Sequence, residues 1–132
     1  MQTQITCGDH RNFTFSNDIH IKAGFHLTVF IADNCSITAG AESYIQCRNN
    51  CVVIAGDNSS IDTGAFCNVI TGSDSTVTAG PGSSVAAGEG TEIRFQWWCG
   101  NDLETTIGKV GEKGLMPAVK YLIVDGRITA IN

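Results

Sequence analysis

The sequence has little charge, little proline and no long hydrophobic run. Only 16% of its 132 residues are charged and 2 are proline, whereas about a quarter of an ordinary soluble domain is charged. No stretch approaches the roughly 18 apolar residues of a membrane span. The N-terminal residues lack the charged start and apolar core of a secretion signal. The net charge of −5 disfavours nucleic-acid or anionic membrane partners. One domain without membrane segments is therefore predicted.

Several functional classes also lack their signatures. The chain has no phosphate loop, nucleophile elbow or zinc-protease motif. It lacks the six-residue repeat of hexapeptide acyltransferases, the GGxGxD turns of calcium-binding nonapeptides and the outward threonine rows of ice-binding solenoids. Its acidic residues are spread over turns and strands, whereas a nucleic-acid mimic needs dense rows. We therefore predict a protein that is not an enzyme and has no cofactor.

What the chain does have is an eight-residue repeat. Twelve octads run without interruption from Ile5 to Gly100. The first position of every octad is β-branched or aromatic and apolar: Ile5, Phe13, Ile21, Val29, Ile37, Ile45, Val53, Ile61, Val69, Val77, Val85 and Ile93. Positions one and three are apolar or small and positions eight and two are mostly polar, which is the alternation of a strand, and the remaining positions carry turn residues. Each octad thus predicts one short strand and one tight turn, which bury an apolar face only by stacking.

Alternate octads differ, and this difference sets the number of strands per coil. In one set the fourth position is always glycine, at intervals of 16 residues: Gly8, Gly24, Gly40, Gly56, Gly72 and Gly88. A true period of 16 with a pseudo-period of eight indicates two strands per coil. The predicted fold is all-β, a two-sided β-solenoid (β-helix) of about six 16-residue coils with a C-terminal β-hairpin cap. We expect the six glycines to adopt a positive φ at one corner.

The prediction divides the chain into a solenoid over residues 1–100 and a capping segment over residues 101–132. The segment ends in a predicted β-hairpin whose strands carry Tyr121, Ile123, Ile128 and Ala130 around an Asp125-Gly126 turn. We expect this segment to pack over an aromatic end of the rod. The N-terminal end, with little chain to cover it, is the better candidate for self-association.

The C-terminal part resembles a known family. Octads such as VTAGPGSS and VAAGEGTE precede a tryptophan-bearing coil, a KVGEKGL segment and a YLIVDG hairpin. Over residues 53–132 this pattern is similar to an uncharacterised β-helix domain family of phage and prophage proteins. The resemblance implies a phage or mobile-element origin and supplies no catalytic residues. A weaker similarity to the heads of trimeric autotransporter adhesins is discounted, because their coils are shorter and no secretion signal or anchor is visible.

The cysteines are interpreted as structural. Cys35, Cys51 and Cys67 recur every 16 residues, and Ser83 and Cys99 continue the same column. An inward column favours small apolar residues, and free cysteine is among the most buried residue types. The CxxxC spacing of Cys47 and Cys51 is weak for a metal site. We therefore expect a reducing compartment, either the bacterial cytoplasm or a virion.

A second column carries a weak candidate for a metal site. His10, His26 and Glu42 follow one another at intervals of 16 residues, and their side chains include metal-ligand types. The simpler interpretation is that they are polar residues at a turn position. Ligands in a straight line also do not surround an ion.

Outward apolar residues are the candidate binding residues. Val52, Ile54 and Ile70 are expected on one face of adjacent coils, extended by Ala86, and Phe30 and Tyr44 on the opposite face. A contiguous apolar patch often marks a protein interface. The alternatives are scattered surface residues or coverage by the C-terminal segment.

The sequence thus predicts a phage- or prophage-derived module that binds a protein partner, either a different protein or a second copy, through a flat face. The alternative is a virion or appendage component that self-assembles into a homo-oligomer. A metal-dependent or nucleic-acid-mimicking protein is a distant third. A virion component should form a stable homo-oligomer and copurify with virus particles, whereas a module directed at a host protein should not.

Overall fold

The computed structural model describes residues 3–6, 12–14, 19–24, 26–30, 32–112, 115–117, 119–124 and 126–130. The described secondary structure is entirely β, as predicted. The strands are β1 (Thr3–Thr6), β2 (Asn12–Thr14), β3 (Ile19–Lys22), β4 (Thr28–Phe30), β5 (Ser36–Thr38), β6 (Tyr44–Gln46), β7 (Val52–Ile54), β8 (Ser60–Asp62), β9 (Asn68–Ile70), β10 (Thr76–Ala79), β11 (Ser84–Ala86), β12 (Glu92–Cys99), β13 (Asp102–Lys109), β14 (Lys120–Val124) and β15 (Arg127–Ala130).

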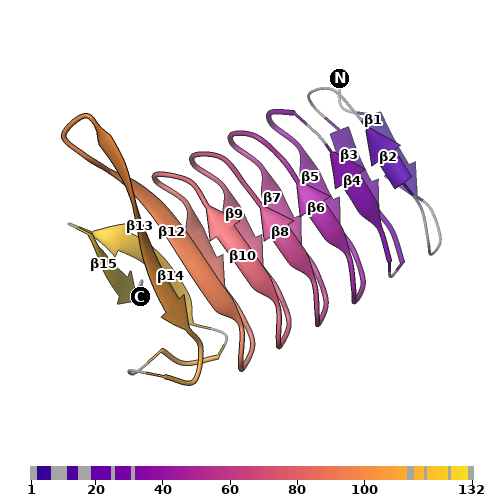
Figure 1. The fold of residues 1–132 in the computed structure, drawn as a ribbon. Coiled ribbons are helices and arrows are strands. Elements are labelled where there is room, and N and C mark those ends of the chain that lie inside the picture. The colour runs from indigo at the N-terminus through magenta and orange to yellow at the C-terminus, as the bar shows by residue number, and fades with distance from the viewer. Residues whose placement is uncertain are drawn as a thin grey trace.

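The strands form two sheets that face each other along a rod (Figure 1). One sheet has eight strands in the order β1-β3-β5-β7-β9-β11-β14-β15, and the other has seven in the order β13-β12-β10-β8-β6-β4-β2. Strands β1 to β12 therefore alternate between the sheets, two to a coil. Neighbours pair in parallel at a register of 16 residues, for example Ile37 with Val53 and Val53 with Val69. The two-sided solenoid is confirmed.

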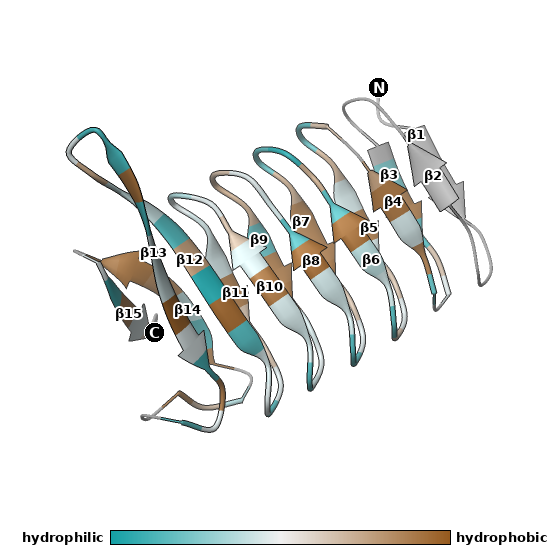
Figure 2. Cartoon of the chain, viewed as in Figure 1, coloured by the Kyte–Doolittle hydropathy of each residue, from teal (hydrophilic) through white to brown (hydrophobic). Residues whose placement is uncertain are grey.

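The first octad position supplies the core. Strands β4 to β9 each bury their middle residue and turn the two flanking residues outward, as in β7, where Val53 lies between the exposed Val52 and Ile54. In β11 all three residues are buried. These middle residues make a continuous hydrophobic band along the rod (Figure 2). A strand of three residues has only one inward position. Stacking on the next coil is therefore what removes its side chain from water.

The left-handed backbone conformation lies at the sixth octad position, so the expectation of a positive φ at the fourth position was wrong. In the part of the chain that the structure describes, seven non-glycine residues have φ between 54° and 61°, and Gly82 and Gly90 continue the series. The seven are His26, Asn34, Glu42, Asn50, Asn58, Phe66 and Asp74. Asparagine and aspartate tolerate this conformation better than other residues with a side chain, which accounts for their frequency in this column.

The fourth-position glycines are required for another reason, the close approach of neighbouring coils. Their backbones stack through direct hydrogen bonds, such as Gly56 N–H to Gly40 O at 3.1 Å and Gly72 N–H to Gly56 O at 3.3 Å. A Cβ built at Gly56 would lie 2.7 Å from the backbone nitrogen of Ala41. A glycine is therefore required at this position because a side chain would overlap the backbone of the neighbouring coil.

Inward hydroxyls at the seventh octad position stabilise one corner. The backbone N–H of each residue donates to the hydroxyl of the residue one coil later: Leu27 to Ser43 at 3.3 Å, Ser43 to Ser59 at 3.3 Å, Ser59 to Ser75 at 3.1 Å and Ser75 to Thr91 at 3.2 Å. These serines are buried. A buried N–H without a partner would cost about 1–3 kcal/mol, so this ladder explains why small hydroxyl residues occupy the column.

The C-terminal segment extends both sheets. The predicted hairpin is β14 and β15, in which Tyr121 pairs with Ala130 and Ile123 with Ile128. Strand β14 continues the eight-stranded sheet antiparallel to β11. Strand β13, which the octad pattern does not predict, pairs antiparallel along the full length of β12. The two extensions meet where the Trp97 indole N–H donates to Thr106 Oγ1 at 2.9 Å and that hydroxyl donates to Gly126 O at 3.0 Å.

The aromatic end is only partly covered. Phe95 is buried, whereas Trp98 is exposed on the long β12–β13 hairpin, where it pairs with Leu103. The reason is that β12 runs straight through the positions at which earlier octads turn. Among the residues that the structure describes, none belongs to a helix long and apolar enough to cross a membrane.

Candidate functional site

Val52, Ile54 and Ile70 lie together on the outer surface of the eight-stranded sheet, called here the eight-strand face. Their exposed fractions are 40%, 40% and 46%. Ile54 pairs directly with Ile70, and Val52 lies two residues before Ile54 on the same side of β7. Three aliphatic side chains thus share one exposed patch on a surface that the sheet hydrogen bonds hold flat.

The expected extension of this patch to Ala86 was wrong. Ala86 is only 8% exposed, and it pairs with Lys120 of β14. The C-terminal segment therefore ends the apolar patch at Ile70. It also places a lysine beside the patch.

A single row crosses the eight-strand face through this patch. The strand registers place the following residues side by side in order: Lys22, Thr38, Ile54, Ile70, Ala86 and Lys120. The two lysines are five strand steps apart, about 24 Å at the usual strand spacing. The aliphatic centre therefore has one lysine on either side of it, and beyond Lys22 the row continues to Thr6 of β1.

The eight-strand face carries no acidic group at its outward strand positions, as far as β3, β5, β7, β9, β11, β14 and β15 are described. The protein as a whole has a net charge of −5. Its acidic residues lie instead at corners, as Glu42 and Asp74 do, and on the seven-stranded sheet, as Asp62 and Glu92 do. The two surfaces of the rod therefore differ in charge.

Phe30 and Tyr44 lie on the other sheet. Both are exposed, and their ring centroids are 6.0 Å apart with planes tilted by 60°. They are diagonal neighbours, because Phe30 pairs with Gln46 and Tyr44 with Thr28. Next to Tyr44 is a shallow depression of about 170 Å³ that includes Asp62. The Tyr44 ring and the Asp62 carboxylate that line this depression make the surface more polar than the aliphatic patch.

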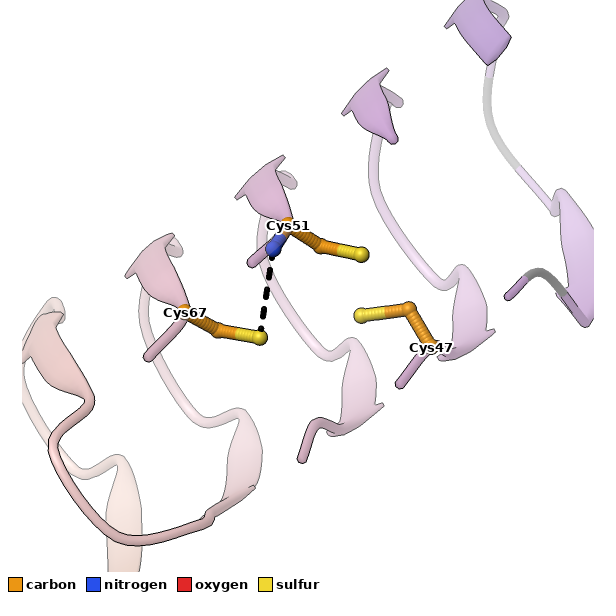
Figure 3. Close-up of side chains that lie close together, drawn as sticks. All are labelled: Cys47, Cys51 and Cys67. Atoms are coloured by element: carbon orange, nitrogen blue, oxygen red, sulfur yellow. Dashed lines mark hydrogen bonds between the residues drawn. The ribbon is translucent and has the colours of Figure 1, made fainter. Parts of the chain in front are cut away.

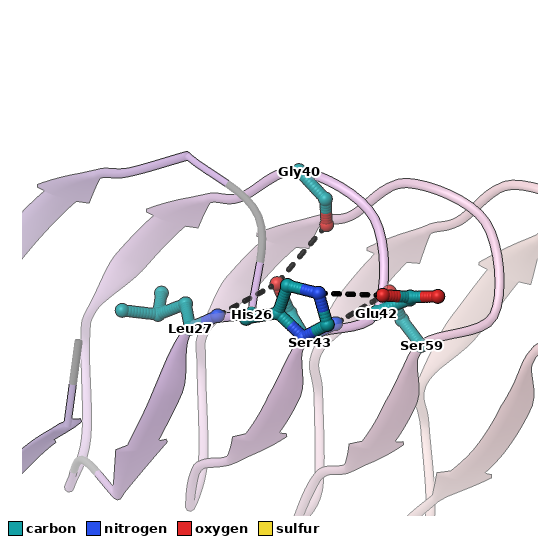
Figure 4. A network of polar contacts seen from close by, with 6 residues as sticks. All are labelled: His26, Leu27, Gly40, Glu42, Ser43 and Ser59. Atoms are coloured by element: carbon teal, nitrogen blue, oxygen red, sulfur yellow. Dashed lines mark hydrogen bonds and ion pairs between the residues drawn. The ribbon is translucent and has the colours of Figure 1, made fainter. Parts of the chain in front are cut away.

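His26 and Glu42 contact each other at one corner. Nε2 of His26 is 2.6 Å from Oε2 of Glu42 (Figure 4). His10, the first residue of the predicted ligand column, lies outside the described residues. In the described part of the chain, no third His, Cys, Asp or Glu completes a ligand set around this pair. The pair's geometry is that of a hydrogen bond between side chains of adjacent coils, next to the serine ladder (Figure 4).

The cysteine column breaks at its end. Cys35, Cys51 and Cys67 are buried at one corner, whereas Cys99 is exposed at the end of β12. The prediction that Cys99 continues the column was wrong, because the chain does not turn in the last octad. Cys51 and Cys67 donate to the backbone carbonyls of Ala32 at 3.3 Å and Arg48 at 3.0 Å.

A cluster that the sequence analysis did not predict joins Cys47 to this column. The Sγ atoms of Cys47, Cys51 and Cys67 all lie within 4.8 Å of one another. Hydrogen bonding from Cys47 and then Cys51 lowers the pKa of Cys67. Hydrogen bonding with Cys51 and Cys67, followed by burial, raises the pKa of Cys47. The signal was present in the CxxxC spacing together with the 16-residue period, which brings Cys67 beside Cys51.

A groove of about 540 Å³ lies at the C-terminal end of the rod. Its lining includes Leu115 and Ile128, with Lys109, Glu112 and Arg127 among its charged residues. Nζ of Lys109 lies 3.9 Å from Oε2 of Glu112. The groove is open, and its charges are of both signs.

The chain matches no protein-family model, no curated protein and no solved structure.

Proposed function

We propose that this protein is a non-enzymatic interaction module that binds a protein partner through its eight-strand face. The observation that carries the proposal is the row with an aliphatic centre at Ile54 and Ile70 and a lysine on either side of it. Apolar centres with polar rims are the usual anatomy of protein interfaces. The phage or prophage origin implied by the family resemblance is part of this proposal.

The charges on the face define the partner's chemistry. A complementary surface has an apolar centre and carboxylates on either side of it, about 24 Å apart. A cationic face on an acidic protein favours such a partner, because complementary potentials speed association and like charges oppose it.

The same charges disfavour a face-to-face pair of identical chains. A two-fold pair that joins the aliphatic centres with the two rows lying along each other brings the lysines of one copy against lysines of the other. Such like-charge contacts across an interface are unfavourable. The row therefore supports a different protein as the occupant, and self-association of this face becomes an outcome of the test.

The test captures partners from a bacterial lysate with the tagged protein and then measures Kd with the purified partner. The aliphatic variant combines Ile54→Ser and Ile70→Ser. Burying the exposed part of either isoleucine is worth on the order of 1–2 kcal/mol, so each change should weaken binding about tenfold. The charge variant, Lys22→Glu with Lys120→Glu, should slow association and alter its dependence on salt.

The matched control is Phe30→Ser with Tyr44→Ser, which removes two exposed aromatic residues from the opposite sheet. We expect this control to bind as the unmodified protein does. Binding that survives the aliphatic variant, or is lost in the control instead, would refute the proposed face. Recovery of only the protein itself in a fixed oligomer that the aliphatic variant dissolves would favour the self-assembling structural component.

A further inference from the structure

Three cysteine side chains converge inside one corner of the solenoid. Cys47 follows β6, Cys51 precedes β7 on the next side of the same coil, and Cys67 precedes β9 one coil later. All three are buried, and their Sγ atoms lie within 4.8 Å of one another. Figure 3 shows the thiols of Cys51 and Cys67 pointing from stacked positions toward that of Cys47. This cluster is separate from both outer faces.

The repeat geometry explains why these side chains meet. The third and seventh positions of an octad face each other across the inside of a corner. At the opposite corner the same relation is a hydrogen bond from Thr71 Oγ1 to Ser75 Oγ at 3.0 Å. Seventh positions of successive coils also stack, so that the Cys51 N–H donates to Cys67 Sγ at 3.4 Å. A cysteine at position 47 therefore faces two others.

The structural role of this column does not require sulfur. Ser83 occupies the next place in it, accepts the Cys67 N–H at 3.1 Å and donates to Gly64 O at 3.0 Å. Cys67 makes the equivalent bond to Arg48 O, also at 3.0 Å. Because a hydroxyl satisfies the same backbone groups, the fold alone does not explain three thiols facing one another.

The donor set points to a soft cation. A metal–sulfur bond of about 2.3 Å places three sulfurs around one ion at about 4 Å from one another, which lies within the 4.8 Å limit of the cluster. In the described part of the chain, no His, Asp or Glu belongs to the group. Structural zinc sites almost always have four ligands, whereas all-sulfur sites with soft ligands also select Cu(I).

We propose that Cys47, Cys51 and Cys67 form a buried trithiolate site for a single soft metal ion, Cu(I). The site lies under the corner between β6 and β7, and its ligands come from two adjacent coils. Occupancy would cross-link these coils without any contribution from the faces of the rod. The proposal is independent of the proposed protein-binding function.

The experiment titrates the reduced, metal-free protein with Cu(I) under anaerobic conditions, against a chromogenic Cu(I) chelator. All proteins carry Cys99→Ser, which removes a thiol that the structure shows exposed, and Cys7→Ser, because Cys7 lies outside the described residues. The test variants are Cys67→Ser and Cys47→Ser. Serine at position 67 should preserve the fold, because Ser83 makes the same hydrogen bonds one coil later. The control is Cys35→Ser, a buried cysteine of the same column outside the cluster.

We expect one Cu(I) per chain, with a sulfur-to-copper charge-transfer band and a higher melting temperature in the loaded protein. Either test variant should weaken binding by more than the roughly 10–100-fold loss typical of outer-shell mutations. The control should bind as the parent does. Circular dichroism of the metal-free variants verifies that they are folded.

Three results would overturn the proposal. One is failure of the parent protein to hold Cu(I) against the chelator. Another is binding that persists in folded Cys67→Ser protein, or that disappears equally in Cys35→Ser protein. The third is tighter retention of Zn(II) than of Cu(I), which would contradict the choice of ion.

Discussion

A methyl group added at Gly56 would collide with backbone rather than with side chains. A Cβ at this position would lie 2.7 Å from Ala41 N, 2.9 Å from Ala41 Cα and 2.9 Å from Gly40 C. These atoms belong to the preceding coil, which cannot move alone, because Gly56 N–H donates to Gly40 O and Gly72 N–H donates to Gly56 O. Relieving the overlap therefore separates coils along the whole corner.

The cost of Gly56→Ala follows from these contacts. Overpacking of an ordered interior costs about 1–3 kcal/mol, and weakening one backbone hydrogen bond adds about 1 kcal/mol. We expect the free energy of unfolding to fall by about 2–4 kcal/mol. Alanine's intrinsic advantage over glycine, about 0.5–1 kcal/mol in regular structure, opposes this only in part.

Urea unfolding followed by circular dichroism measures the change through the transition midpoint. The matched control is Gly100→Ala, at a glycine with φ of 64° and no atom within 4 Å of an added Cβ. Its expected cost is limited to the conformational penalty of about 1–2 kcal/mol. Equal losses at the two sites, or a loss below about 0.5 kcal/mol at Gly56, would contradict the steric explanation of the glycine column.

Three further predictions concern two positions of the solenoid and one of the C-terminal segment. Asn58 has a φ of 57°, so Asn58→Val should destabilise the protein by about 1–2 kcal/mol and Asn58→Gly should not, as thermal unfolding would show. Burial raises the pKa of the Asp62 carboxyl, so its ionisation opposes folding as pH rises through that pKa. Asp62→Asn should therefore raise the melting temperature at pH 7 and lose this gain as the pH falls below the ordinary value of 3.8; a gain that grows in acid would contradict the shift. The buried Tyr121 hydroxyl accepts the Met116 N–H at 2.8 Å, and Tyr121→Phe should cost about 1 kcal/mol in urea; no loss would mean that this contact is not stabilising.

The fold was predictable because the repeat is a local pattern with a global consequence. Each octad has one inward apolar residue, and a unit this small has no way to bury it except by stacking. The alternation of glycine between octads then fixed two strands per coil. The β14–β15 hairpin was predictable for a similar reason, because alternating residues such as Tyr121 and Ile123 flank a turn dipeptide.

The errors occurred where one column has two physical explanations. Glycine permits a positive φ and also permits close backbone approach. The presence of glycine at position 56 does not by itself show which of the two is required. Cys99 matched the octad spacing, but pairing of β12 with β13 kept the chain straight there. Strand pairing depends on a segment distant in sequence, and periodicity within the octads contains no information about it.

The candidate surface was predictable only in outline. Alternation placed Val52, Ile54 and Ile70 outward, as the structure has them. That Lys120 ends the row beside Ala86 depends on how the C-terminal segment pairs with β11. The convergence of Cys47 with Cys51 and Cys67 likewise depends on side chains from the two sides of one corner and from the next coil.

The sequence by itself therefore determined the repeat, the inward and outward residues and the two-sheet solenoid, since these follow from the period of hydrophobic burial. Only the tertiary structure decided which backbone positions are left-handed, where the last coil fails to close, which charges flank the aliphatic patch and which thiols meet. Each of these depends on contacts across coils or sheets, and such contacts are set by the packing of the whole rod.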